Sequence, residues 1–144
     1  MDHKIKYSIY YGLMATIAAE LFLVILVHHV FHHLPSQSLE FFVPSGFITF
    51  FISSALWYFR IENKEKYNLL RAILTAVIAI VFIHSIVIII RFFTIPVYAN
   101  FGEIVSIMFK SLFMFGIFTF PIAILLTIMF FSIRKRKLNK KGHS

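Results

Sequence analysis

The chain has 144 residues, of which 60% are hydrophobic and 14% charged, with a formal net charge of +8 and no cysteine. Soluble domains contain about 45–50% apolar and about 25% charged residues, so this composition excludes an ordinary water-soluble fold. The absence of cysteine excludes disulfides, thiolate metal sites and cysteine nucleophiles.

Four stretches are apolar enough to cross a bilayer, whose hydrocarbon core of about 30 Å requires roughly 20 helical residues. In chain order they cover residues 8–31, 41–59, 72–90 and 111–133. They do not alternate apolar and polar residues with a period of two, which excludes the strands of a membrane barrel. Because the connections are short, we expect a single all-α membrane domain, a four-helix bundle made of two helical hairpins.

The first stretch carries one charge, Glu20, about 14 residues beyond Lys6. At 1.5 Å per residue this places Glu20 roughly 20 Å along the helix, near the middle of the bilayer. A carboxylate at that depth is costly unless it is paired, protonated or hydrated, so it marks a candidate functional position. Two interpretations of Glu20 are open: it takes part in a helix-packing contact, or it forms a proton or ligand site.

A histidine cluster ends the first stretch, formed by His28, His29, His32 and His33. Residues four apart share one face of a helix, which is the spacing that Zn²⁺, Cu²⁺ or Ni²⁺ ligands use. Three interpretations compete for the cluster. It is a polar cap at the membrane interface, a metal- or pH-sensing patch with carboxylates from Glu40 or Glu103, or a source of haem ligands.

The three later stretches supply polar groups that could surround Glu20. The second has hydroxyls every four residues, at Ser45, Thr49 and Ser53. The third contains His84, 13 residues beyond Arg71 and therefore at a depth similar to that of Glu20. We expect a hydrogen-bonded pair between Glu20 and His84.

The fourth stretch carries a series of small residues that includes Thr119. Membrane helices use such series for close packing and for hydrogen bonds between helices. The candidate intramembrane polar site therefore consists of Glu20, Thr49, Ser53, His84 and Thr119.

A basic tail, residues 134–144, follows the fourth stretch directly. With the N-terminus inside, only Arg91 and Lys110 of the 14 Lys and Arg residues lie outside, so both termini are expected in the cytoplasm. The tail would contact anionic lipid headgroups rather than nucleic acid. The cations that would make this contact are Arg134, Lys135, Arg136, Lys137, Lys140 and Lys141.

The chain lacks a phosphate-binding loop and a pair of carboxylates in one segment, so an enzyme is disfavoured. The sequence favours an accessory, assembly or regulatory subunit of a plasma-membrane complex, bound to another membrane protein or to copies of itself. Two alternatives stay open. One is a histidine-ligated protein that binds haem b or a divalent transition metal, although no cofactor is the simplest expectation. The other is a small oligomeric transporter that uses Glu20 as a proton or cation site.

Overall fold

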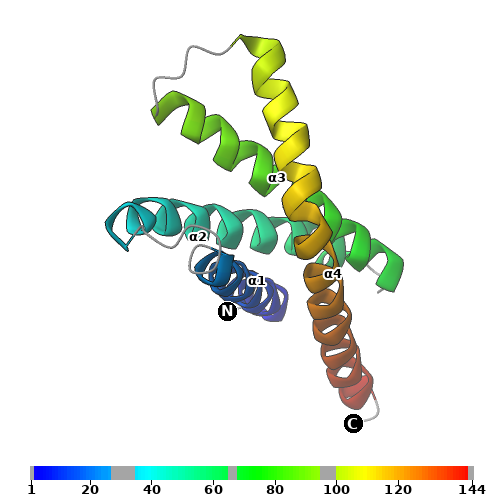
Figure 1. Cartoon of the computed structure of the whole chain (residues 1–144). Coiled ribbons are helices and arrows are strands. Elements are labelled where there is room, and N and C mark those ends of the chain that lie inside the picture. The colour runs from blue at the N-terminus through cyan, green and yellow to red at the C-terminus, as the bar shows by residue number, and fades with distance from the viewer. Residues whose placement is uncertain (1, 27–34, 65–67, 95–99, 143–144) are drawn as a thin grey trace.

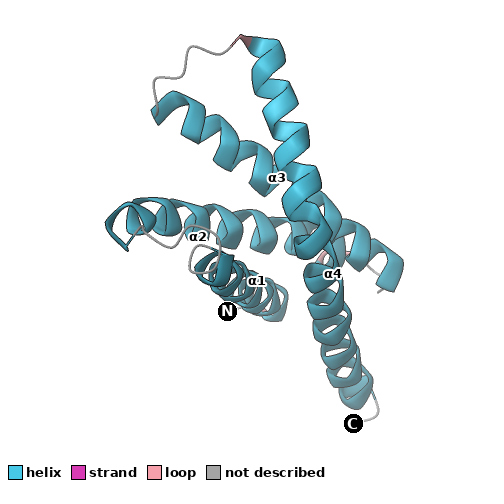
Figure 2. Cartoon of the chain, in the orientation of Figure 1, coloured by secondary structure: helices cyan, strands magenta, loops and turns pink. Residues whose placement is uncertain are grey.

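The computed structural model describes residues 2–26, 35–64, 68–94 and 100–142, and the secondary structure within them is helical (Figure 2). In chain order the elements are α1 (His3–Leu26), α2 (Pro35–Trp57), η2 (Tyr58–Glu62), α3 (Leu69–Thr94) and α4 (Phe101–Gly142). The π-helical turn η2 continues α2 without a break. The all-α prediction is confirmed for this part of the chain.

Three of these helices, α1, α3 and α4, are long and apolar enough to cross a membrane. They correspond to the first, third and fourth predicted spans. The second predicted span, 41–59, falls on α2 and η2, which are not among the three, and it stays a prediction.

The helices extend beyond the predicted spans. Pro35 is the first residue of α2, where its fixed φ suits a helix start and its missing N–H is not needed. Residues 134–142 were expected to form a separate tail, but they continue α4. Hydropathy locates the part of a helix that lies in lipid, whereas backbone hydrogen bonding continues past it into the polar region.

Polar side chains set the starts of three helices. Asp2 and Asn68 each accept a hydrogen bond, of 3.1 and 2.9 Å, from the backbone N–H two positions later in the chain. At α4, Asn100 accepts from the N–H of Glu103 at 2.9 Å, and the Glu103 carboxylate accepts from the N–H of Asn100 at 3.1 Å. This reciprocal arrangement is a capping box, which explains why α4 begins at Phe101.

The helices α2, α3 and α4 cross near the middle of α4 and spread apart away from this crossing (Figure 1). The C-terminal end of α2, the start of α3 and the middle of α4 lie together, whereas the start of α2 lies far from the start of α4. The accessible surface is 9985 Å². A compact protein of this mass would expose about 7,600 Å², so the arrangement is open.

One face of α2 forms the centre of the packing. Its buried residues recur every four positions and are Ser45, Thr49, Ser53 and Trp57, with Ile61 following in η2. The neighbouring α3 presents a buried series of small residues, Ala72, Thr75, Ala76 and Ala79. Small side chains allow the backbones of membrane helices to approach closely.

Candidate functional site

A buried ion pair lies where the helices meet, between Glu62 of η2 and Arg134 of α4. The two residues are 3% and 7% exposed. The guanidinium donates from Nε to Oε1 at 3.1 Å and from Nη2 to Oε2 at 3.0 Å, so the pair is bidentate. The indole Nε1 of Trp57 donates a third hydrogen bond, of 3.2 Å, to Oε1. The carboxylate is therefore satisfied within the protein.

The π-helical turn explains how Glu62 reaches this position. The N–H of Asn63 bonds to the carbonyl of Tyr58 at 2.9 Å, which is the i to i+5 pattern of a π-helix. In an α-helix, residues five apart point about 140° from each other. The wider turn places Trp57 and Glu62 on the same face, so both side chains are buried against α4.

Aromatic rings enclose the ion pair. Tyr11 of α1 stacks on Trp57 with ring centroids 4.1 Å apart, and its hydroxyl shares a 2.9 Å hydrogen bond with that of Thr127 on α4. The Arg134 guanidinium lies 3.7 Å from the ring centroid of Tyr7. We call Tyr11, Trp57, Glu62, Thr127 and Arg134 the junction. It connects α1, α2 and α4 through contacts between residues distant in sequence.

The buried position of Arg134 in the junction differs from the role predicted for this residue. That residue was grouped with the lipid-contacting cations of the tail, but its side chain is buried against Glu62. The next three residues, Lys135, Arg136 and Lys137, are exposed. The side chains of Lys140 and Lys141 lie outside the described residues. Sequence reasoning missed Glu62, because a charge in the short connection between the second and third predicted spans resembles an ordinary solvated residue.

The residues predicted to surround Glu20 separate into two groups in the structure. Ser45 of α2 donates to Glu20 Oε1 at 3.0 Å, and Thr49 and Ser53 are buried on the same face of α2 as Ser45. A Cβ added at Gly46 would lie 3.0 Å from the same carboxylate oxygen. These groups belong to the contact between α1 and α2.

His84 and Thr119 belong to the other group, on α3 and α4. His84 Nδ1 lies 3.0 Å from the carbonyl oxygen of Ile80, one turn earlier in α3, and the imidazole ring is 6.4 Å from that of Phe115. Thr119 donates to the carbonyl of Phe115 at 3.0 Å. Glu20 and His84 thus have different hydrogen-bond partners among the described residues, and the expected pair is not formed within the chain.

The predicted histidine cluster, His28, His29, His32 and His33, lies outside the described residues, as does the side chain of Glu40. Glu103, the other proposed carboxylate ligand, takes part in the capping box of α4. Within the part of the chain that the structure describes, no group of three His, Asp or Glu side chains is placed to hold a metal ion.

Comparison of this chain with protein-family models, with curated proteins and with solved structures finds no match. The functional assignment therefore rests on the geometry of the chain itself.

Proposed function

We propose that this chain is a plasma-membrane protein with four transmembrane helices and both termini in the cytoplasm, and that it serves as an accessory, assembly or regulatory subunit of a membrane complex. The observation that carries the proposal is the combination of a polar interior used for joining helices with a large uncovered apolar surface.

The polar groups act between helices of the chain itself. The carboxylate of Glu62 accepts three hydrogen bonds, and Arg60 Nε of η2 donates to Thr75 of α3 at 3.2 Å. A catalytic group needs a side chain free to act on a substrate. Groups that are fully used in packing support a structural role for the interior.

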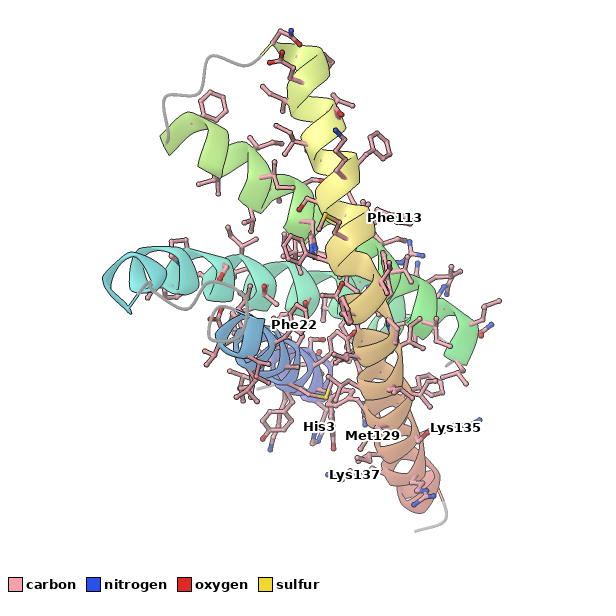
Figure 3. The ribbon with its side chains drawn as sticks, in the orientation of Figure 1. His3, Phe22, Phe113, Met129, Lys135 and Lys137 are labelled. Atoms are coloured by element: carbon pink, nitrogen blue, oxygen red, sulfur yellow. The ribbon has the colours of Figure 1, made fainter. Side chains whose placement is uncertain are left out.

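Large apolar side chains are exposed on all four helices, for example Ile17, Phe51, Phe82 and Phe113. Figure 3 labels Phe113 and Met129 along α4, and both are more than half exposed. In a bilayer such faces contact either lipid or another helix. Helices associate in lipid through close packing and through hydrogen bonds rather than through the hydrophobic effect, so an open, splayed chain offers several faces to a partner.

The cations near the junction support the proposed orientation. Lys135 and Lys137 lie beside the same end of the molecule as His3 (Figure 3), and Lys4 and Lys6 are exposed at the start of α1. Cations close to membrane spans favour the cytoplasmic side and contact anionic headgroups there. This supports both a cytoplasmic junction and a lipid contact for the exposed cations.

The test is purification of the full, tag-cleaved chain from its native membrane at native expression level, in two mild detergents. We expect one partner at a constant ratio to this chain in both preparations and after a high-salt wash. Quantitative mass spectrometry of the purified sample measures that ratio.

The alternatives give different results. A chain that purifies alone, and that conducts protons or cations in liposomes unless Glu20→Gln is introduced, would establish transport instead. A Soret band, or one equivalent of bound metal lost in a His28→Ala/His32→Ala variant, would establish cofactor binding instead. Either outcome would overturn the accessory role.

A further inference from the structure

Part of the exposed face of α1 follows the spacing of a heptad repeat. Tyr10, Leu13, Ile17, Glu20 and Val24 are spaced alternately by three and four positions, and at 100° per residue they fall within an arc of about 80°. All four apolar members are at least 45% exposed, and Glu20 is half-buried. We call this face the α1 seam. Alternating spacing of three and four is the pattern with which two helices pack along their length.

The α1 seam is separate from the face that α1 presents to α2. A Cβ at Gly12 would collide with Ser54 of α2, and the methyl group of Thr16 lies beside Gly46. These residues therefore face α2. Glu20 lies at the border between this contact and the seam. Its Oε1 accepts from Ser45, and its Oε2 accepts no hydrogen bond among the described residues.

We propose that the α1 seam binds the α1 seam of a second copy of this chain, and that Glu20 of the two copies forms a shared carboxyl contact within this interface. A carboxylate at this depth is costly unless it is paired, protonated or hydrated, and a second carboxyl group supplies both a partner and a shared proton. The neighbouring apolar residues of the seam supply neither, and among the residues that the structure describes only Oε1 of Glu20 accepts a hydrogen bond.

The chemistry of Glu20 favours a second copy of this chain as the partner that binds the α1 seam. Two copies inserted in the same orientation are related by a two-fold axis along the membrane normal, so each residue of the seam lies opposite its own equivalent. The two Glu20 carboxyls then meet at the same depth. Like charges at contact distance cannot both be ionised, so one proton is shared, with one carboxyl as donor and the other as acceptor. Ser45 of each copy stabilises the remaining oxygen.

The experiment uses the natural absence of cysteine. Single variants Leu13→Cys, Ile17→Cys and Val24→Cys are reconstituted alone in liposomes and oxidised with copper phenanthroline. We expect disulfide-linked dimers at these seam positions. Phe47→Cys is the matched control, because Phe47 is 61% exposed against 60% for Ile17 and is adjacent to Gly46, which lies beside Glu20. We expect at least tenfold less dimer for this control.

The role of Glu20 is tested by the dissociation constant of the dimer in bilayers, measured by energy transfer between labelled chains. Glu20→Ala should raise that constant roughly 3- to 30-fold, since hydrogen bonds between membrane helices contribute about 0.6–2 kcal/mol. Glu20→Gln should bind nearly as well, because an amide both donates and accepts. Ser45→Ala removes the internal hydrogen bond but leaves the seam intact, so its dimer should persist.

Equal cross-linking at Phe47→Cys and at the seam positions, absence of cross-links at the seam, or equal dimer affinity for Glu20→Ala and the natural chain would each overturn the proposal. Fluorescence of Trp57, the only tryptophan in the chain, confirms that each variant is folded. The liposomes contain no other protein. A monomer in them would therefore reject self-association without affecting the co-purification result on which the accessory role depends.

Discussion

Adjacent charged residues can have opposite roles when a helix leaves the membrane. Arg134 is buried against Glu62, whereas Lys135, the next residue, is exposed. A 100° step around α4 changes the environment from protein interior to solvent or headgroup. The planar guanidinium also matches a carboxylate in a bidentate way that an ammonium cannot. The junction therefore depends on the first cation of the tail being arginine.

We predict that Glu62→Gln lowers the free energy of unfolding by about 3–5 kcal/mol, because it leaves the buried charge of Arg134 without a partner. The substitution keeps the shape of the side chain and an oxygen that can accept from Trp57 Nε1. The free energy is measured by denaturant titration in mixed micelles, followed by circular dichroism so that altered Trp57 fluorescence does not bias the result.

The double variant Glu62→Met/Arg134→Met is the control for this prediction. Replacing both charges removes the uncompensated one, so we expect recovery of at least half of the lost stability. A double variant as unstable as Glu62→Gln would show that the ion pair is not the reason for the loss.

At the scale of helices, the contact of α1 with α2 depends on Gly12, a residue without a side chain. A Cβ at Gly12 would lie 2.9 Å from the carbonyl oxygen of Phe50 and would collide with the hydroxyl of Ser54. Among the residues that the structure describes, that hydroxyl is buried and has no hydrogen-bond partner. The two backbones therefore approach at Gly12, in the small-residue packing that membrane helices use.

We predict that Gly12→Ala separates α1 from α2 and lowers the midpoint of thermal unfolding in detergent, by an amount equivalent to about 1–3 kcal/mol of overpacking. Ser54→Ala alone should not destabilise the protein, since it removes an unsatisfied hydroxyl. Combined with Gly12→Ala it should restore part of the loss, because it removes the nearest clashing atom. An unchanged midpoint for Gly12→Ala would disprove this close approach.

The start of α4 depends on the capping box of Asn100 and Glu103. We predict that Asn100→Ala costs about 1 kcal/mol, the usual contribution of an N-cap side chain. The effect should be local, and faster amide hydrogen exchange in the first turn of α4 would reveal it. Asn100→Asp keeps the acceptor and should exchange at nearly the natural rate. Equal protection in the alanine and natural chains would show that the cap contributes nothing.

At the scale of the whole molecule, the longest helix, α4, is long compared with the thickness of a bilayer. The 42 residues of α4 extend about 63 Å, twice the thickness of the hydrocarbon core. The interval between Lys110 and Arg134 corresponds to about 36 Å. We therefore expect the capping box to lie outside the cell and the exposed cations after Arg134 to lie in the cytoplasm.

This orientation predicts the labelling of single cysteines in intact cells by a membrane-impermeant maleimide. Asn100→Cys should be labelled from outside, whereas Lys4→Cys and Lys137→Cys should be labelled only after the membrane is permeabilised. All three residues are exposed, so accessibility within the protein does not distinguish them. Labelling of Lys4→Cys in intact cells would show that the N-terminus lies outside, the reverse of the proposed topology.

The amino-acid sequence by itself determined the helical class, the membrane environment and the positions of three long apolar helices. These properties follow from composition and from the length of apolar runs. Both are local features of the sequence and do not depend on contacts with distant parts of the chain. The sequence also marked Glu20 as an unusual residue, because a carboxylate inside a long apolar run can be recognised without knowing its tertiary neighbours.

Only the tertiary structure decided which polar residues meet. The predicted group around Glu20 separated because matched depth does not specify which way a side chain faces around a helix. The junction escaped prediction because it requires a π-helical turn to bring Glu62 onto the face of Trp57, and a partner, Arg134, 72 positions away. Such contacts depend on how helices cross and rotate, and hydropathy carries no information about either.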